Sequence, residues 1–329
     1  YQIDILEMEH FDKGYEAVPE GVHILKPYKK KSYGRFINAI LWRLRIYFPT
    51  LVRNWLVKDD YDIEIMFEVM YPDIPFSKRN IKKIYWVHGS IEDFSNTWRK
   101  NRFRKYFSDA TKIISISNRT EQSIIDLYPE QQGKITRIYN GYDFKDIINK
   151  SKEKSDIDIH EKSICSIGRI ESKKGSDRTL ELIRMLHEKG HKYHMYYIGS
   201  GELEETLKSR VEQYKLSEYI HFLGYQSNPY KYLKDMELLL SMSKQEGFPG
   251  VYVEALSLGI PFVSTDVGGA AELSQKGRFG KIINTDEQAV EEIIKYIEGS
   301  EVFNKEEARE FLSTFTIEKQ IEDIEKIFK

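Results

Sequence analysis

Strand-like runs alternate with helical segments along most of this chain. In the second half, segments with apolar residues at helical spacing separate five such runs: residues 163–168 (SICSIG), 193–199 (YHMYYIG), 219–225 (YIHFLGY), 238–243 (LLLSMS) and 261–267 (PFVSTDV). Strands that follow one another through helices pair in parallel, because a parallel crossover needs a dozen or more residues. The alternation therefore predicts an α/β protein with doubly wound parallel sheets, in which residues 261–267 form the last strand.

The length of 329 residues exceeds what one hydrophobic core usually supports, and the first half repeats the alternation. Residues 150–160 are polar and lack periodicity, which is typical of a linker. We therefore expect one domain over residues 1–150 and a second over 151–315. Residues 316–329 are expected to form a C-terminal helix that crosses back to the first domain.

The first helix of the second domain can be placed in more detail. It should follow the run at residues 163–168, be capped by Ser176 or Asp177, and end at Gly190. Its core face is expected to carry Leu180, Ile183 and Leu186.

Composition excludes several classes of protein. With 40% hydrophobic and 31% charged residues and a net charge of -2, the chain resembles neither disordered nor fibrous proteins. The one cysteine, Cys165, lies in an apolar run, so neither a disulfide framework nor a cluster of thiolate metal ligands is available. No run of about 18 uncharged apolar residues occurs. These features favour a cytoplasmic protein.

The segment 243–273 (SKQEGFPGVYVEALSLGIPFVSTDVGGAAEL) is the most informative motif. Pro249 suits the start of a helix and Gly259 suits its end, which places Glu246 on the preceding loop and Glu254 about one turn inside. The backbone N–H groups of residues 247–250 then lie at a helix N-terminus, where phosphate or hydroxyl oxygens bind. For Glu254 alone, stabilisation of the helix dipole is an equally good explanation.

A second motif, residues 166–175 (SIGRIESKKG), presents cations after a strand. Arg169, Lys173 and Lys174 would lie at the same edge of the sheet as Glu246, where they could neutralise a diphosphate. The alternative for Lys173 is an ordinary solvated lysine. A third candidate is His88, which directly follows the strand-like run 83–87; a lone histidine in such a place is usually structural.

These motifs, with FLGY at 222–225 and GGAAEL at 268–273, resemble those of glycosyltransferase family 4 over nearly the whole chain. The family contains retaining enzymes of the GT-B fold, in which two Rossmann-like domains face each other across a cleft. Family members open with a strand and a glycine-rich loop that touches the donor phosphates. This chain begins after that position, so we expect that the strand and loop are missing from it.

The resemblance also implies a role for each candidate residue. Arg169 and Lys174 would hold the donor diphosphate, Glu254 the ribose hydroxyls, and Glu246 the transferred sugar. Beside the sugar would lie Gly247, Phe248 and Pro249, while Gly224 and Tyr225 would face the base and Gly199 would line the pocket. His88 would contact the sugar at the reaction centre. Such enzymes need no carboxylate pair at glycosidase spacing, and we expect neither a metal nor a cofactor.

A basic, aromatic segment precedes these motifs. Residues 26–58 contain nine Lys or Arg and no Asp or Glu, interleaved with seven aromatic residues. Lys29, Lys30 and Lys31 belong to it, and a second basic run at 98–107 includes Arg99 and Arg102. Basic and aromatic residues together favour an anionic membrane surface, whereas the alternative is a solvated basic helix. No nucleic-acid-binding motif is present, so we discount nucleic acid as a partner.

We therefore expect transfer of a hexose or N-acetylhexosamine from a nucleotide sugar, UDP being the expected nucleotide. The expected acceptor is a glycan linked to polyprenyl diphosphate at the inner face of the cell membrane, during assembly of a surface polysaccharide such as a capsule. Two alternatives remain open. One is an epimerase of nucleotide sugars on the same fold. The other is a non-catalytic GT-B subunit that supports a catalytic partner.

Overall fold

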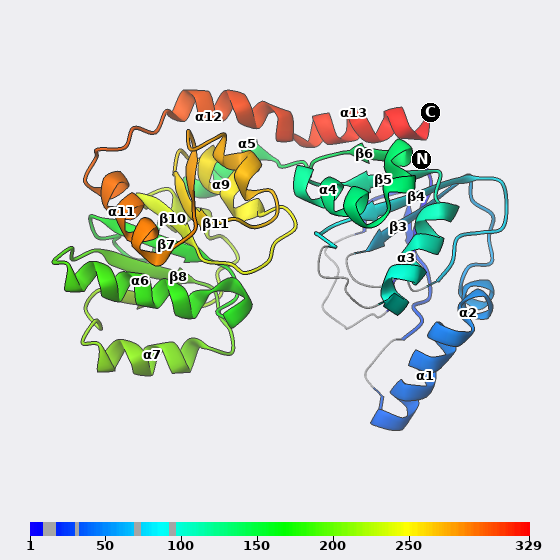
Figure 1. Ribbon diagram of the computed structural model, residues 1–329, viewed down its shortest axis with the longest axis horizontal. Helices are drawn as coiled ribbons and strands as arrows, with labels where there is room; N and C mark the ends of the chain where they lie inside the picture. Colours follow the sequence, from blue (N-terminus) through cyan, green and yellow to red (C-terminus); the bar gives the residue numbers. More distant parts are fainter. Residues whose placement is uncertain (9–17, 30–32, 69–73, 92–96) are drawn as a thin grey trace. The chain divides into compact units, whose positions relative to one another are not determined.

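The computed structural model describes residues 1–8, 18–29, 33–68, 74–91 and 97–329 (Figure 1). The chain divides into two compact units. One contains residues 1–86 and 94–113, and the other contains residues 87–93 and 114–329. Each unit is described by itself below, and the domain boundary expected at residue 150 stays a prediction. Among the described residues, no helix has both the length and the apolar character needed to cross a membrane.

The first unit begins with two short parallel strands, β1 (Ile3–Ile5) and β2 (Val22–Ile24). Helices α1 (Arg35–Tyr47) and α2 (Pro49–Leu56) follow, and α3 (Thr97–Asp109) completes the unit. Its core includes Tyr85, whose ring packs edge-on against Phe103 and Phe107 of α3 at centroid distances of 6.0 and 5.0 Å.

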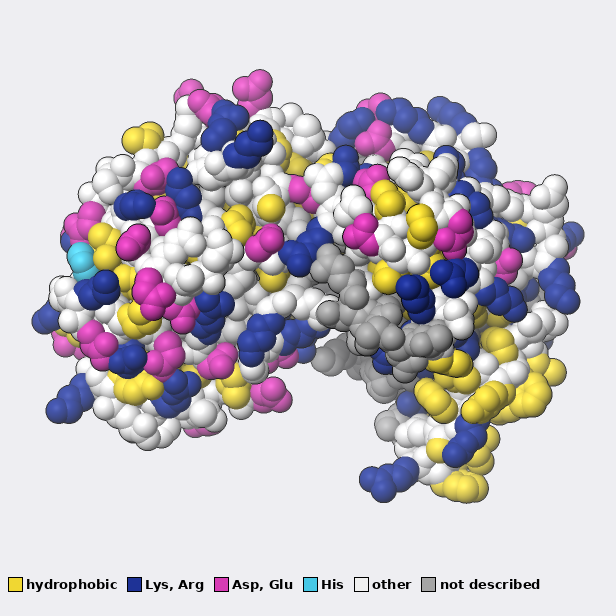
Figure 2. Space-filling view, viewed as in Figure 1, with side chains coloured by type: hydrophobic (Ala, Val, Ile, Leu, Met, Phe, Trp, Pro, Cys, Tyr) yellow, Lys and Arg dark blue, Asp and Glu magenta, His cyan; other side chains and the backbone are white. Residues whose placement is uncertain are grey.

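Helices α1 and α2 bury few of their apolar side chains. Of the residues in these two helices, Val52 alone is fully buried. Large apolar side chains are exposed instead, and hydrophobic atoms gather over this part of the surface in Figure 2. The exposed set comprises Phe36, Ile37, Ile40, Trp42, Leu44, Tyr47, Leu51 and Trp55, together with Phe48 between the helices.

A four-stranded sheet has the order β3-β4-β5-β6, and the boundary between the units runs through β4 and β5. Its strands are β3 (Ile63–Glu68), β4 (Lys82–Val87), β5 (Lys112–Ser115) and β6 (Ile135–Arg137). Helices α4 (Asn118–Leu127) and α5 (Phe144–Ser151) flank β6, with a 3-10 helix at Pro129–Lys134. Because α5 continues to Ser151, the expected linker starts slightly later than residue 150.

The second unit contains a six-stranded sheet in the order β12-β11-β10-β7-β8-β9, and all its neighbouring strands are parallel. The strands are β7 (Ser163–Ile167), β8 (His194–Ile198), β9 (Ile220–Phe222), β10 (Leu238–Ser241), β11 (Phe262–Thr265) and β12 (Gly280–Ile283). The chain builds outward from β7 to β9, returns to β10 beside β7, and then builds outward on the other side. The strand order therefore reverses between β7 and β10, the position at which open α/β sheets bind ligands.

The prediction that residues 261–267 form the last strand is wrong, because β12 adds an edge strand beside β11. This strand has only four residues and contains Lys281, so it gives little apolar signal.

The helices that follow the strands of this sheet are α6 (Ser176–Glu188), α7 (Glu204–Gln213), α8 (Tyr230–Leu233), α9 (Gly250–Ser257), α10 (Ala270–Ser274) and α11 (Asp286–Ile297). At the end of the chain, α12 (Lys305–Leu312) packs against α9, and α13 (Ile317–Phe328) follows it. A 3-10 turn at Ser172–Lys174 precedes α6, and another at Ser313–Phe315 precedes α13. The core joins α6, α7 and α11 to β7, β8 and β10. Cys165 is buried in β7, where burial raises the pKa of its thiol.

The start of α6 differs from the sequence prediction. Leu180, Ile183 and Leu186 form the buried face as expected, but neither Ser176 nor Asp177 is the cap. The N-cap is Gly175, whose φ is +68°. A Cβ atom at Gly175 would lie 1.9 Å from the carbonyl oxygen of Met242. The close approach of the two loops therefore requires glycine here, and a capping side chain has no room.

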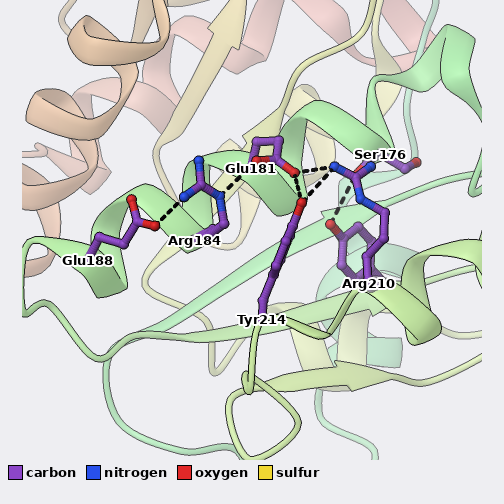
Figure 3. Close-up of polar contacts among 7 residues, drawn as sticks. Ser176, Glu181, Arg184, Glu188, Arg210 and Tyr214 are labelled. Atoms are coloured by element: carbon purple, nitrogen blue, oxygen red, sulfur yellow. Dashed lines mark hydrogen bonds and ion pairs between the residues drawn. The ribbon is translucent and has the colours of Figure 1, made fainter. Parts of the chain in front are cut away.

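Ion pairs and hydrogen bonds tie α7 to α6 at the surface (Figure 3). Glu181 of α6 accepts hydrogen bonds from Arg184 Nε at 2.9 Å and from the Tyr214 hydroxyl at 2.8 Å. Arg210 also donates to Glu181, and Arg184 continues the network to Glu188. These groups are partly exposed, so each pair contributes at most about 1 kcal/mol. The network holds two helices together and contains none of the candidate site residues.

Candidate functional site

An ion pair joins the two loops at the point where the strand order reverses. Lys174 follows β7 and Glu246 follows β10, and these strands are neighbours in the sheet. The Lys174 Nζ atom lies 2.7 Å from Glu246 Oε1, and both side chains are partly buried. Residues 72 positions apart thus meet at the carboxyl end of the parallel strands, where a ligand would be held.

Backbone contacts hold these two loops together. The Lys244 backbone N–H donates to the Lys173 carbonyl at 2.9 Å, and Lys244 Nζ donates to Ser172 Oγ at 2.7 Å. Together with the contact between Gly175 and Met242 described above, these bonds fix the spacing of the loops. The ion pair therefore lies on two loops that are bonded to each other.

Ser243 is a member of this cluster that sequence reasoning missed. Its hydroxyl donates to Glu246 Oε1 at 2.7 Å, the same oxygen that Lys174 contacts. Ser243 lies three residues before Glu246, in a position where a serine hydroxyl can reach a neighbouring side chain. Two donors on one oxygen orient the carboxylate and leave its other oxygen for a ligand.

His88 lies against the glycine that follows Glu246. A Cβ atom at Gly247 would be 2.2 Å from the His88 carbonyl oxygen and 3.1 Å from the Gly89 Cα. Gly268, at the end of the loop after β11, would place a Cβ atom 2.4 Å from the Gly247 carbonyl oxygen. Three loops, which follow β4, β10 and β11, therefore converge on Gly247 with no space for a side chain there.

The imidazole of His88 is neutral near pH 7. Desolvation by burial lowers its pKa to about 4, because the charged form loses hydration. A neutral imidazole can donate from one ring nitrogen and accept at the other. It can therefore hydrogen-bond a ligand hydroxyl without introducing a charge.

The N-terminus of α9 offers backbone donors. Pro249 is the residue that precedes the helix, with ψ of 95°, and not part of the first turn as expected from the sequence. The Tyr252 N–H donates to the Pro249 carbonyl at 3.1 Å, and no side chain caps this end. The N–H groups of Gly250 and Val251 can therefore bind an oxygen-rich ligand.

Phe248 supplies only its backbone to this end of the helix. Its ring is buried against Gly269 and packs near the rings of Tyr139 and Phe315, at centroid distances of 5.5 and 5.6 Å.

Glu254 lies within α9 and is half-buried. Burial raises the pKa of its carboxyl group, and a hydrogen bond from the Tyr230 hydroxyl opposes this rise. Tyr142 lies close by, because a Cβ atom at Gly250 would be 3.1 Å from its hydroxyl oxygen. Tyr230 was not singled out from the sequence, because only the folded structure shows that its hydroxyl reaches Glu254.

Glycines bring the loops after β7, β8 and β9 close together. The Gly199 backbone N–H donates to the Gly224 carbonyl at 2.8 Å. Gly199 has a φ of +146°, and a Cβ atom there would lie 1.9 Å from the Gly168 carbonyl oxygen. Tyr225, directly after Gly224, is 79% exposed. The edge of the sheet next to Lys174 is therefore lined by backbone, with one aromatic ring free to contact a ligand.

Arg169 is placed differently from Lys174. Its side chain is 71% exposed and forms an ion pair with Glu171 Oε2 at 3.0 Å. The structure thus joins Lys174 to Glu246 and His88 to Gly247, while Arg169 extends into solvent from the same loop.

The residues expected to face the acceptor or membrane belong to the first unit, apart from two that cannot be placed. Lys30 and Lys31 lie outside the described residues, and the backbone N–H of Lys29 donates to the Met8 carbonyl at 3.0 Å. Arg99 and Arg102 are on α3. The Arg102 guanidinium donates to the Ile46 carbonyl at 3.4 Å and lies over the rings of Trp98 and Tyr106. Arg102 therefore holds α3 to α1.

Two family models match the chain. Residues 147–311 match the model described as Glycosyl transferases group 1, and residues 12–146 match the model described as Glycosyltransferase Family 4. Together the two matches extend over most of the sequence. The Family 4 model matches the first half, and the group 1 model matches the second half.

Two curated relatives are similar in sequence. The N-acetylgalactosamine-N,N'-diacetylbacillosaminyl-diphospho-undecaprenol 4-alpha-N-acetylgalactosaminyltransferase of Campylobacter jejuni is 28% identical over 197 residues, which are 60% of this chain and 53% of that protein. The capsular polysaccharide biosynthesis glycosyltransferase CapM of Staphylococcus aureus is 27% identical over 211 residues, which are 61% of this chain and 54% of that protein. The chain thus spans little more than half the length of these relatives.

A solved structure supports the fold. The crystal structure of Anabaena Alr3699/HepE in complex with UDP superposes with a TM-score of 0.64 at 17% sequence identity, over 75% of this chain and 72% of that one. The predicted GT-B fold is therefore confirmed. With both of its halves matched by family models, the chain belongs to glycosyltransferase family 4 and carries a group 1 glycosyltransferase domain as its second half.

Proposed function

We propose that this protein is a retaining glycosyltransferase that moves a hexose or N-acetylhexosamine from a UDP-sugar to a lipid-linked glycan during assembly of a surface polysaccharide. The observation that carries the proposal is the pair formed by Lys174 and Glu246 at the reversal of the strand order. A cation and an oriented carboxylate side by side suit a ligand that has a diphosphate at one end and sugar hydroxyls at the other.

Different residues around the pair would bind different parts of the donor. Lys174 would turn from Glu246 toward the diphosphate, with Arg169 extending from the same loop. Glu246 would accept hydrogen bonds from hydroxyls of the transferred sugar, and the backbone N–H groups at the start of α9 would bind its other oxygens. Glu254 would accept from the ribose hydroxyls. UDP as the nucleotide is favoured by the HepE structure, which contains UDP.

The reaction needs charge stabilisation more than proton transfer by a side chain. The bond between the sugar C1 and the diphosphate oxygen breaks, and the bond between C1 and the acceptor oxygen forms on the same face. The acceptor hydroxyl proton passes to the departing diphosphate oxygen, so the products are UDP and the extended glycan. Lys174 offsets the negative charge that develops on the leaving group. We propose that no metal or cofactor takes part, because the lysine supplies this charge.

The acceptor is proposed to be a glycan on polyprenyl diphosphate. The Campylobacter relative is named for a diphospho-undecaprenol acceptor, and CapM for capsular polysaccharide biosynthesis. Helices α1 and α2 add a physical reason, since their exposed rings include Phe36 at 79%, Tyr47 at 68% and Phe48 at 59% (Figure 2). Arg35, Arg43 and Arg45 lie among them. Aromatic rings settle at the depth of lipid headgroups, and arginines attract anionic lipid.

The direct test is a donor and acceptor screen with the full chain. UDP-, GDP- and ADP-sugars are incubated with a lipid-linked glycan acceptor, and nucleotide release is measured together with the anomeric configuration of the product. We expect release from a UDP-sugar that depends on acceptor, and a product with the donor's configuration. An inverted product would contradict the retaining mechanism. Epimerised sugar nucleotide without acceptor would identify an epimerase instead, and no turnover with any donor would favour a non-catalytic subunit.

A further inference from the structure

Three histidines meet at the other end of the six-stranded sheet. His194 is the first residue of β8, His221 lies in β9, and His160 lies three residues before β7. One ring nitrogen from each histidine can be chosen so that all three atoms lie within 4.8 Å of one another. In the part of the chain that the structure describes, no other group of three His, Cys, Asp or Glu residues meets this criterion. The candidate donor site uses loops at the carboxyl ends of the strands, so these histidines belong to a separate place.

The sheet register explains how His194 and His221, 27 positions apart, come together. Tyr196 is directly opposite His221 in the β8–β9 pair, and His194 lies two residues before Tyr196. Side chains alternate between the faces of a strand, so these three residues share one face. Met195 and Tyr197 point to the other face, into the apolar core. The Tyr196 ring stacks on His221 with centroids 4.5 Å apart, which orients that imidazole.

The backbone of His160 is fixed although its side chain is exposed. Its N–H donates to the Tyr196 hydroxyl at 3.1 Å, and its carbonyl accepts from the Ser163 hydroxyl. The imidazole itself stacks on His194, with centroids 4.0 Å apart and 13° between the planes. Because the ring is exposed, it can turn about its side-chain bonds while the main chain stays in place.

The distances suit ligands of a transition metal. His194 Nδ1 lies 3.1 Å from His221 Nε2. Two imidazoles on a tetrahedral ion, with bonds of about 2.0–2.1 Å, hold their nitrogens about 3.3 Å apart. The planes of the stacked rings are nearly parallel, so His160 must rotate for its lone pair to converge with the other two. The exposed ring can make this rotation about the Cα–Cβ and Cβ–Cγ bonds of His160.

Neutral imidazole is the form that binds a metal ion. One of the two facing nitrogens of His194 and His221 carries a hydrogen. Binding of a metal moves this hydrogen to the other nitrogen of the same ring through solvent, with no net change in charge.

We propose that His160, His194 and His221 form a binding site for a divalent transition metal of the zinc type, with water in the fourth position. Metal binding clamps the segment before β7 onto β8 and β9, and so stabilises the second sheet. This site is independent of the proposed transfer reaction, whose residues lie in loops at the carboxyl ends of the strands.

The test uses the full chain without a histidine tag, first treated with a chelator and then titrated with Zn²⁺ by calorimetry and thermal unfolding. The variant is His160→Gln, which removes an exposed ring and keeps the backbone bonds to Tyr196 and Ser163. The matched control is His191→Gln, a histidine of the same half outside the cluster. Titration with Co²⁺ gives an independent readout, because four-coordinate Co²⁺ has a strong visible absorption.

We expect the wild type to bind one Zn²⁺ per chain with a rise in the unfolding temperature. His160→Gln should weaken binding by at least about tenfold, and His191→Gln should bind like the wild type. The Co²⁺ absorption should appear in the wild type and fall in His160→Gln. Equal affinity of the wild type and His160→Gln, or no binding to the wild type, would overturn the proposal.

Discussion

The loops at the carboxyl end of the six-stranded sheet and the basic, aromatic segment of residues 26–58 use side chains in opposite ways. At the sheet edge, glycines and an ion pair set positions tightly, and a single added Cβ atom at Gly175, Gly199 or Gly247 would collide with backbone. In α1 and α2, large side chains extend into solvent and only Val52 is buried. In the function proposed above, the first region recognises the donor by geometry, whereas the second recognises a membrane surface by its general character. The two should therefore respond differently to substitution.

The largest expected effect concerns Glu246. Glu246→Gln keeps the shape of the side chain but removes its charge, so turnover should fall about 100-fold. The free energy of unfolding should change by less than about 1 kcal/mol, because the pair with Lys174 is partly exposed. Nucleotide release and denaturant unfolding measure the two quantities.

The control for this variant is Glu181→Gln in the α6–α7 network. It should lower stability and leave turnover within about twofold, because Glu181 belongs to no candidate site. If Glu246→Gln turns over at the wild-type rate, Glu246 has no role in the reaction, and the contrast with the structural Glu181 is wrong.

Acid should destabilise the protein through His88. The pKa of His88 is about 4 in the folded state and about 6.5 when unfolded, so between these values the unfolded chain binds a proton that the folded chain does not. Stability due to neutral His88 is complete above pH 6.5 and is lost as the pH falls toward 4, by on the order of 2 kcal/mol after allowance for partial exposure.

Urea unfolding from pH 7 to pH 4 measures this effect. His88→Asn lacks the titrating group, so its stability should depend less steeply on pH than that of the wild type. Parallel curves for the two proteins would show that His88 is as solvated as an exposed histidine.

The basic, aromatic segment should tolerate substitution in folding but not in membrane binding. Trp42→Ser removes a ring that is 52% exposed, and should weaken binding to anionic liposomes about tenfold. The free energy of unfolding should change by no more than about 0.5 kcal/mol. Co-sedimentation with liposomes is the measurement, and Val302→Ser, which changes an exposed apolar residue elsewhere, is the control. If Trp42→Ser sediments with liposomes like the wild type, α1 does not contact the membrane.

The smallest effect is expected at Tyr230. Tyr230→Phe removes one hydrogen bond to Glu254, so KM for the donor should rise about fivefold with kcat unchanged. A fall in kcat with constant KM would show that Glu254 acts on the reaction centre and not on the ribose. Steady-state kinetics over a range of donor concentrations separate these outcomes.

Much of the fold could be predicted because its signals are local. Apolar runs and helical periodicity place β7 to β11 and the buried face of α6, and the parallel pairing follows from the alternation. The cap of α6 could not be predicted, because the collision at Gly175 involves Met242, 67 residues away. The strand β12 was missed because four residues with a lysine among them carry no clear pattern.

The candidate site was predictable in its residue types but not in its contacts. Motifs singled out Lys174 and Glu246, yet their hydrogen bond depends on β7 lying beside β10. Ser243 and Tyr230 gave no signal, since serines and tyrosines occur throughout the chain. The three histidines were also invisible from the sequence, because only the registers of β7, β8 and β9 bring them together.

The most direct test of the donor site is the affinity for UDP measured by calorimetry. Lys174→Ala should bind UDP at least about tenfold more weakly than the wild type, because the cation at the reversal of the strand order is lost. Lys192→Ala, which removes an exposed lysine two residues before β8 and outside the site loops, should bind UDP like the wild type. Equal affinity of the wild type and Lys174→Ala would contradict the assignment of the diphosphate to this pair.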